Sequence, residues 1–306
     1  MFDITNPIFT DAEKAREHLE RLTWPEGPFC PHCGEVENVH RLQGKSHRAG
    51  LIQCNSCLKN FTVTVGTVFE RSKVPLNKWL LATYLMASSK KGMSAHQIHR
   101  MLGVTYKTAW FMMHRIREAM KQDTGPFGGP NSYVEVDETY VGGKSKNRAF
   151  KKPAKKKIVV ALVERNTLFD NGKVRSFHVA NVTAKTLRPL VVTHVKRDTY
   201  LLTDKASHYR KFGREYQVHG STDHSAGQYV SGHDHTNTVE NFFSIFKRGV
   251  IGTYHHMSEC HLHRYTAEFD FRYNTKDVDD RTRSDELLKG IVGKRLTYRR
   301  TDKLAA

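Results

Sequence analysis

The sequence predicts an α/β protein whose main domain is a mixed β-sheet flanked by helices. Short apolar strands follow one another from residue 132, and strand and helix patterns then alternate. Two close cysteine pairs and a long helical stretch lie before this region, and they predict two smaller modules ahead of the sheet. A chain of 306 residues is long enough for two or three domains.

The chain is strongly basic. It has 49 Lys and Arg residues against 31 Asp and Glu residues, a formal net charge of +18. A globular protein with this excess most often binds a polyanion, and a basic protein without such a partner is the alternative. No apolar run approaches the length of a membrane span, and the N-terminus lacks the order of a signal peptide. We therefore expect a cytoplasmic protein with no membrane partner.

Residues 1–24 contain one predicted helix. Thr10 or Asp11 is suited to cap it, and Trp24 with Pro25 ends it. We assign this helix a packing role only.

Residues 25–70 are predicted to form a zinc ribbon. The residues between the two cysteine pairs are 34–53, which is the spacing of a tetrahedral four-thiolate site for one structural Zn²⁺. Buried free cysteines and a redox pair are the alternatives, but a redox role needs only one pair. Zinc would provide much of the folding energy of so small a ribbon. The predicted ligands are Cys30, Cys33, Cys54 and Cys57.

Residues 71–123 are predicted to form a helix-turn-helix. Helical spacing begins at Leu76, Gly103 marks a tight turn, and Thr105 caps a second helix that runs to Met120. We expect the second helix to enter the major groove of DNA, and an ordinary helical hairpin is the alternative. The polar residues of this helix that are expected to face outward are Lys107, His114, Arg115 and Arg117. The lysine and the two arginines are candidates for DNA binding.

Residues 131–275 hold the predicted sheet. Strands are expected at residues 132–141, 158–163, 174–182, 200–203 and 216–219, with a helix at residues 183–195. Three strands, then helix, strand and helix, is the order of elements that an RNase H-like fold requires.

Three acids are predicted to converge in this domain as a metal site. Asp137 lies centrally in the first strand, and Asp204 follows the fourth. Glu240 lies on a helix at residues 237–247, where it shares a face with Lys247. Like charges packed together repel strongly, so such a trio makes sense only around cations. Nearby acids that are more often surface residues are Glu135, Glu138, Asp223 and Asp234.

Two basic segments flank these motifs. A run of lysines and arginines between the first two strands is either a solvated loop or a grip on phosphates. Its DNA-binding candidates are Lys151, Lys152, Lys155, Lys156 and Lys157. The basic C-terminal segment, residues 276–306, is expected to clamp DNA or to be partly disordered.

Taken together, these motifs resemble the DDE-type bacterial insertion-sequence transposases with an N-terminal zinc ribbon (the IS fifteen-ninety-five family). The resemblance covers most of residues 28–275, and it is carried by residues 30–34, 136–144, 203–204, 235–244, 247–249, 252–256 and 269–274. It implies an RNase H-like catalytic domain that uses two Mg²⁺ (or Mn²⁺) ions. The implied triad is Asp137, Asp204 and Glu240. Lys247 would be a nearby basic residue that contacts DNA, and Arg248 beside it is a further DNA-binding candidate.

The resemblance also implies a reaction and its partners. The protein would bind the terminal repeats of an insertion sequence, cleave one strand there and transfer it to double-stranded target DNA. A homodimer or larger assembly on DNA, associated with the nucleoid, is expected. A transcription regulator with the same ribbon and helix-turn-helix, and an RNase H-like nuclease without strand transfer, are the alternatives. If Glu240 is not the third acid, Asn237 and Asn241 flank it and are the first replacements to test.

Overall fold

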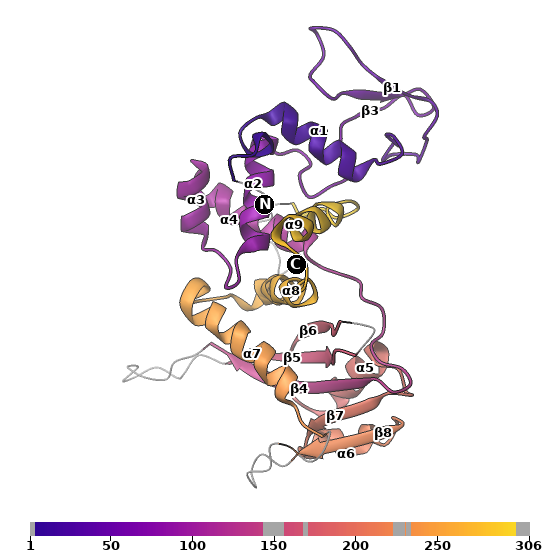
Figure 1. Ribbon diagram of the computed structural model, residues 1–306, viewed down its shortest axis with the longest axis vertical. Coiled ribbons are helices and arrows are strands. Elements are labelled where there is room, and N and C mark those ends of the chain that lie inside the picture. Colours follow the sequence, from indigo (N-terminus) through magenta and orange to yellow (C-terminus); the bar gives the residue numbers. More distant parts are fainter. Residues whose placement is uncertain (1–3, 143–155, 168–170, 223–229, 231–233, 298–306) are drawn as a thin grey trace, which may run out of the picture. The chain divides into compact units, whose positions relative to one another are not determined.

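The computed structural model describes residues 4–142, 156–167, 171–222, 230 and 234–297 (Figure 1). The chain forms two compact units, and each is described by itself. The first comprises Met1–Lys121 with Asp277–Ala306, and the second comprises Gln122–Lys276. The predicted α/β class is confirmed by a five-stranded mixed sheet in the second unit.

The helices of the first unit begin and end where local chemistry requires. The short 3₁₀ helix η1 (Pro7–Phe9) precedes α1 (Ala12–Thr23), which is capped by Asp11 through the amides of its first turn. After α2 (Leu76–Ser88), α3 (Ala95–Leu102) ends at Gly103, whose φ of +60° favours glycine. Thr105 then caps α4 (Tyr106–Ala119), so the predicted helix, turn and helix are present.

The C-terminal segment returns to the first unit. It forms α9 (Asp280–Lys289), capped by Asp279. Asp285 lies 3.1 Å from Nε2 of His18 on α1, and the Lys294 ammonium donates to the carbonyl of Ala119 at 2.9 Å. The described part of this segment is therefore ordered against helices that lie far away in the sequence.

Three short strands form the ribbon of the first unit. They are β1 (Val39–Arg41), β2 (Ile52–Cys54) and β3 (Asn60–Phe61), joined in that order as an antiparallel sheet. This matches the small antiparallel ribbon predicted around the cysteine pairs.

The sheet of the second unit has the strand order β6-β5-β4-β7-β8. Its members are β4 (Tyr133–Val141), β5 (Lys157–Glu164), β6 (Val174–Val179), β7 (Tyr200–Asp204) and β8 (Val218–Thr222). β4, β5 and β6 are antiparallel neighbours, whereas β7 and β8 run parallel to β4. This mixed order confirms the predicted RNase H-like arrangement.

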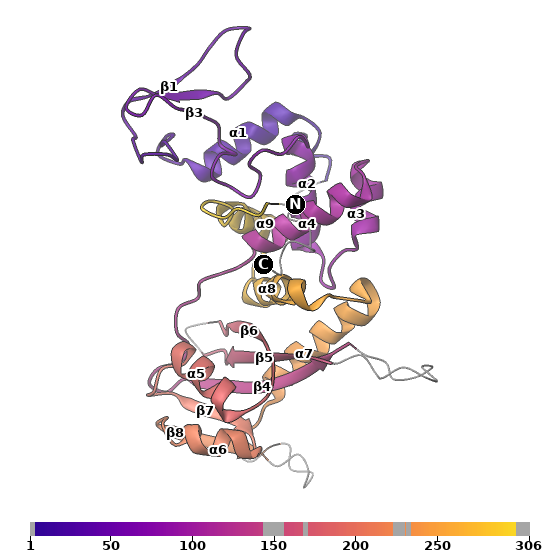
Figure 2. The same cartoon turned by 180° about the vertical axis from the view of Figure 1, so that it is seen from behind.

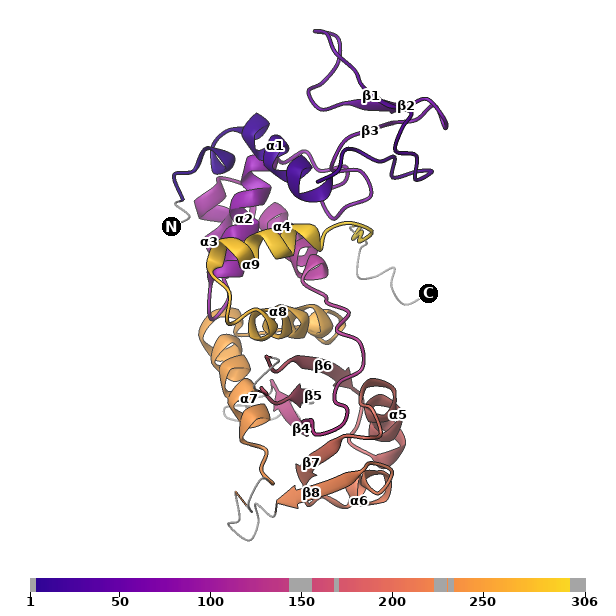
Figure 3. The same cartoon turned by 45° about the vertical axis from the view of Figure 1, so that its right-hand side comes forward.

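Helices cover both faces of that sheet. On one face lie α5 (Ala184–His194) and α6 (Ser207–Gly213), seen in front of the strands in Figure 2. On the other lies α7 (Asn237–Gly249), followed by η3 (Val250–Tyr254), η4 (Glu259–His261) and α8 (Leu262–Asn274) (Figure 3). Alternate residues of β4, β5 and β6 enter the two cores, because successive strand side chains point to opposite faces.

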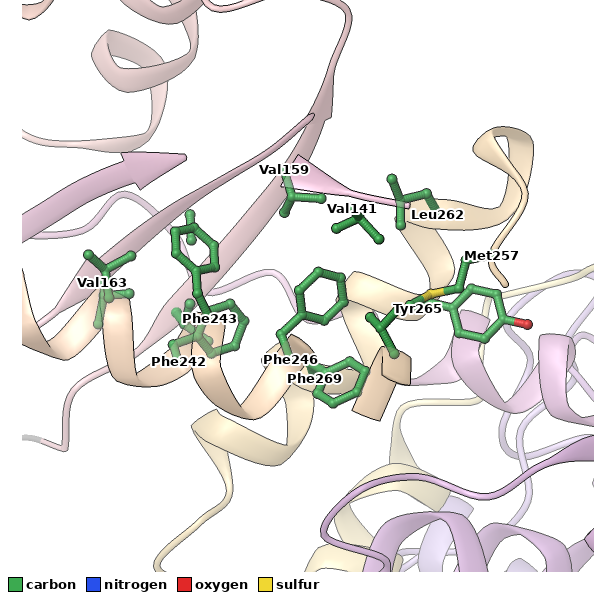
Figure 4. Close-up of a cluster of buried hydrophobic side chains, with 14 residues drawn as sticks. Val141, Val159, Val163, Phe242, Phe243, Phe246, Met257, Leu262, Tyr265 and Phe269 are labelled. Atoms are coloured by element: carbon green, nitrogen blue, oxygen red, sulfur yellow. The ribbon is translucent and has the colours of Figure 1, made fainter. Parts of the chain in front are cut away.

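The core beneath α7 is built from aromatic residues. Phe242, Phe243 and Phe246 of α7 pack with Phe269 of α8 against valines of β4 and β5 (Figure 4). The rings of Phe246 and Phe269 meet edge-on with centroids 5.0 Å apart. The predicted apolar face of the 237–247 helix is thus the face that fixes α7 to the sheet.

The outer edge of β6 is closed by α8. Asp270 accepts the amide and the hydroxyl of Ser176, at 2.9 and 2.7 Å. One turn later, Asn274 accepts the amide of Val174 and donates to its carbonyl. An uncovered edge strand can pair with other chains, so these two side chains protect the sheet. They also give a structural reason for the motif at residues 269–274.

Candidate active site and metal centre

Two of the predicted acids are brought together by the strand register. β4 and β7 pair in parallel from Tyr133 with Tyr200 to Val136 with Thr203, so the next pair in register is Asp137 with Asp204. Val134, Val136 and Leu201 belong to the core under α5 and α6. Because side chains alternate, Asp137 and Asp204 face the opposite side, which is the side of α7.

The third acid comes from the first turn of α7. Glu240 is exposed, and its Oε1 accepts the hydroxyl of Thr236 at 3.1 Å. Lys247 and Arg248 lie in the last turns of the same helix and are also exposed. Val239, directly before Glu240, is completely buried, so the backbone that carries this carboxylate is fixed in the core.

The acids act on one another electrostatically. Burial, helped by the charges of Glu138, Asp204 and Glu240, raises the pKa of Asp137 to about 7 against the opposing bond from the Glu138 amide. Such mutual repulsion is the condition that a bound cation relieves. Carboxylate oxygens are also the donors that Mg²⁺ and Mn²⁺ prefer, so the residues present fit divalent ions.

The three carboxylates are spaced more widely than the ligands of a single closed site. In the described part of the chain, the only group of three or more His, Cys, Asp or Glu ligand atoms within 4.8 Å of one another is that of the four cysteines.

Glu138 points away from this face. Its carboxylate accepts the hydroxyl of Tyr209 on α6 at 2.8 Å, and burial raises its pKa. Burial together with the charge of Glu138 raises the pKa of Tyr209 well above its usual value. The phenol therefore stays protonated and holds Glu138 on the α6 side of the sheet.

Glu135 is a residue that sequence reasoning missed. It is fully buried and binds the first turn of α7, whereas the pattern alone made it a surface acid. Two features of the sequence pointed to it: it has the same strand parity as Asp137, and Arg165 follows the neighbouring strand.

The cysteine site is the second candidate metal centre. The Sγ atoms of Cys30 and Cys57 are 3.6 Å apart, as are those of Cys33 and Cys54. A tetrahedral zinc with Zn–S bonds of about 2.3 Å separates its sulfurs by about 3.8 Å, so this cluster fits a structural Zn²⁺.

Glu35 joins the two cysteine turns. Its Oε1 accepts the amides of Val36, Glu37 and Asn38, and its Oε2 accepts the hydroxyl of Ser56 at 2.7 Å. These bonds, with that from Ser56 the strongest, lower the pKa of Glu35 to about 2. Gly34 has a φ of +79°, which the tight turn after the first pair requires.

The predicted DNA-binding residues fall into different environments. Lys107 is exposed at the start of α4, and Lys156 is exposed next to β5. Lys157 is half-buried and donates to the carbonyl of Met257. The remaining candidates of that basic run lie outside the described residues: Lys151, Lys152 and Lys155.

The prediction that α4 turns its arginines outward is wrong. Arg115 and Arg117 are only 5% and 2% exposed, and His114 is fully buried. Arg115 donates to the carbonyl of Glu70 at 2.6 Å and lies over the ring of Trp79, 5.3 Å from its centroid. The long apolar stems of arginine allow such burial. Neither arginine is available to a DNA phosphate.

No helix in the described ranges is long and apolar enough to cross a membrane.

Two family models match parts of this chain. Residues 129–274 match the ISXO2-like transposase domain, and residues 10–60 match the transposase zinc-ribbon domain. An uncharacterized protein in transposable element ISH50 of Halobacterium salinarum is 28% identical over 86% of this chain and 91% of its own length. An uncharacterized transposase-like protein of Haemophilus influenzae is 26% identical over 39% of this chain and 94% of its own length.

One solved structure also aligns weakly. It is a chain of the simian T-cell lymphotropic virus intasome in complex with a PP2A regulatory subunit. The two chains are 16% identical with a TM-score of 0.29. The alignment covers 56% of this chain and 63% of the viral complex chain. A likeness this weak carries no argument.

Proposed function

We propose, from the premise that this chain belongs to the insertion-sequence transposases with an N-terminal zinc ribbon, that it cleaves the ends of a DNA element and joins them to target DNA. The observation that supports this most directly is the strand register that sets Asp137 beside Asp204 on the face of the sheet covered by α7, whose first turn carries Glu240. Three carboxylates from two adjacent strands and one helix are a suitable donor set for cation-assisted chemistry on phosphates.

Asp137, Asp204 and Glu240 would hold two Mg²⁺ or Mn²⁺ ions. Such ions, when bound, supply Lewis acidity at the attacking and leaving oxygens of a phosphodiester. Asp137 must be ionised to act as a ligand, so cation binding displaces the proton that its raised pKa favours. Thr236 orients the carboxylate of Glu240 through its hydroxyl.

The proposed reaction has two stages at one centre. Water attack at the element end breaks the bond to a 3′ oxygen and frees a 3′-hydroxyl. That hydroxyl would then attack a phosphate of the target DNA, forming a new phosphodiester bond and displacing the 3′ oxygen of the adjoining target nucleotide, which leaves as a hydroxyl. Both stages are in-line displacements at phosphorus, so no covalent protein–DNA intermediate is needed and no Ser or Tyr nucleophile is assigned.

Other parts of the chain would hold the DNA. The ribbon (residues 25–70) and the helix-turn-helix (residues 71–123) would bind the terminal repeats, with Lys107 at the exposed start of α4. Lys247 and Arg248, exposed on the helix of Glu240, would contact the DNA backbone near residues 131–275, the proposed catalytic domain. Joining two ends calls for a dimer or larger assembly.

Strand transfer in vitro tests the proposal. Purified protein is incubated with the terminal DNA of its own element, a supercoiled plasmid and Mg²⁺, beside Asp204→Asn and Glu240→Gln. We expect joined products with the wild type, and DNA binding without cleavage in both variants. Wild-type cleavage by Asp204→Asn would rule the triad out.

The same experiment separates the alternative functions. Binding without cleavage by the wild type would favour a transcription regulator. Cleavage without joining would favour a nuclease. Cleavage that survives in Glu240→Gln but not in Asp204→Asn would mean that another residue completes the site, with Asn237 or Asn241 the first to test.

A further inference from the structure

Helix α7 begins without the side-chain cap that usually starts a helix. Its N-cap position is Thr236, which makes no side-chain bond to the first-turn amides and donates instead to Glu240. The first amides of a helix have no partner within the helix and need an acceptor from elsewhere. At α7 the acceptor comes from the sheet, because Oε2 of Glu135 accepts the amide of Val239 at 2.8 Å.

The buried carboxylate of Glu135 is compensated by an ion pair and by hydrogen bonds. Its side chain is 0% exposed, and burying a carboxylate is costly unless it is paired and fully hydrogen-bonded. Oε1 accepts Nε of Arg165 at 2.6 Å and the hydroxyl of Thr238 at 2.8 Å. The Arg165 guanidinium is itself fixed, since it lies over the ring of Tyr133.

The Glu135–Arg165 pair holds the start of α7 at two points. Glu135 binds Thr238 and Val239 in the first turn. Arg165 donates to the carbonyl of His235 at 2.8 Å, just before the N-cap. The first turn of α7 is therefore bound by a residue of β4, and the residue just before its N-cap is bound by the residue that follows β5.

Only one peptide bond separates this attachment from Glu240, a residue of the proposed metal site. Val239, whose amide is bound by Glu135, directly precedes Glu240. On β4, Glu135 and Asp137 are two residues apart, so they share a face of the sheet. β4 thus carries Asp137, an acid of the proposed site, and also Glu135, which fixes α7. α7 in turn carries Glu240, another acid of the proposed site.

We infer that Glu135, paired with Arg165, is a positioning residue that sets the distance of Glu240 from Asp137 and Asp204. The inference rests on the proposed function. Groups that orient metal ligands without touching the metal typically change metal affinity or activity by about 10- to 100-fold when they are removed. The carboxylate of Glu135 binds Arg165 and the first turn of α7, and Nδ1 of His235 lies 3.4 Å from its Oε1, so it is not offered as a ligand.

The test measures Mn²⁺ binding rather than activity alone. Zinc-loaded full-length protein is titrated with Mn²⁺ in the absence of DNA, and the concentration of free Mn²⁺ is measured by electron paramagnetic resonance. In Glu135→Gln the amide nitrogen cannot accept a bond, so at least one of the Arg165, Thr238 and Val239 donors loses its acceptor. We expect the Mn²⁺ dissociation constant to rise about tenfold. Single-turnover cleavage should slow at low Mn²⁺ and recover as Mn²⁺ is raised, with DNA affinity within twofold of wild type.

The chain offers a matched control in Glu268. This glutamate on α8 is also 0% exposed, pairs with Arg272 and accepts a hydroxyl, that of Tyr254 at 2.6 Å. Glu268→Gln removes a chemically equivalent buried charge that is not bound to the start of α7. We expect a comparable loss of thermal stability with the Mn²⁺ dissociation constant within twofold of wild type.

The outcomes separate this inference from the proposed function. Wild-type Mn²⁺ binding by Glu135→Gln, or an equal loss in Glu268→Gln, would overturn the positioning role and leave the triad intact. Wild-type Mn²⁺ binding by Glu240→Gln would overturn both. If Glu135→Gln does not fold, Thr238→Val removes one donor and keeps the ion pair. It should raise the dissociation constant about threefold, and an unchanged value would count against the inference.

Discussion

Replacing Asp270 by Asn is predicted to remove a pH dependence from the stability of the second unit. Asp270 on α8 accepts two hydrogen bonds from Ser176 on the edge strand β6. Burial raises the pKa of this carboxyl to about 7, although the Ser176 bonds oppose the shift. In the unfolded chain an aspartate titrates near about 3.9.

The sign and the size follow from these two pKa values. Between about pH 4 and pH 7 the folded protein holds a proton that the unfolded chain has released. The stabilising contribution is therefore complete below pH 4 and is lost as the pH rises through about 7. A gap of about three pH units corresponds to at most about 4 kcal/mol, and we expect roughly half of that because Asp270 keeps some contact with solvent.

Asparagine can keep both bonds without titrating. Its carbonyl oxygen accepts the Ser176 amide, and its amide nitrogen can donate to the Ser176 hydroxyl, which is able to accept as well as donate. Asp270→Asn should therefore hold at pH 8 the stability that the wild type has only in acid. Asp123, whose side chain is 97% exposed beside Arg175, provides a control substitution to Asn with no expected effect.

Urea unfolding at pH 5 and pH 8 measures the difference. The three tryptophans are at positions 24, 79 and 110 in the first unit, so their fluorescence follows that unit, and circular dichroism follows both. Only about two of the three pH units lie between pH 5 and pH 7, so the wild type should lose about 1.4 kcal/mol more than Asp270→Asn between the two measurements. Parallel pH profiles for the two proteins would refute the reasoning.

Three further predictions concern the metal site of the ribbon and the core. Removing zinc with excess chelator should unfold residues 25–70, because the four cysteines then lose the ion that holds them together. Retained protease resistance of this segment would contradict the prediction. Glu35→Gln should speed zinc release to a colorimetric chelator about tenfold by loosening the two cysteine turns, and an unchanged rate would show that Glu35 does not support the site. Phe246→Ala should cost about 3–5 kcal/mol in urea unfolding, since the ring is 1% exposed between α7 and α8; a loss below about 1 kcal/mol would mean that the core is not packed as described.

Local chemistry explains what could be predicted from the sequence. The cysteine spacing, the glycine at position 103 and the cap at Thr105 each depend on a few adjacent residues. The order of strand and helix patterns predicted a mixed sheet flanked by helices. The same patterns, together with the likeness of the motifs to a family, predicted that Asp137 and Asp204 converge. The strand register brings these two residues side by side. That they bind a metal stays a prediction.

What escaped prediction depends on contacts between distant segments. A helical pattern does not tell which polar residues of α4 are buried, and Arg115 is held by the carbonyl of Glu70, far away in the sequence. The return of α9 to α1 rests on such a contact too, between Asp285 and His18. Glu135 looked like a surface acid because its partners, Arg165 and the start of α7, follow only after long intervals of chain.

Glu135 and Asp137 show how one strand can give two carboxylates different roles. They point to the same face of β4, and both are withdrawn from solvent. Glu135 meets a guanidinium, a hydroxyl and a helix amide, so its charge is balanced by the protein alone. The charges that act on Asp137 are those of Glu138, Asp204 and Glu240, all negative. Environments that differ in this way separate the roles of neighbouring acids. Glu135, whose charge is compensated, is suited to positioning the site, and Asp137, which is surrounded by negative charges, is suited to binding a cation there.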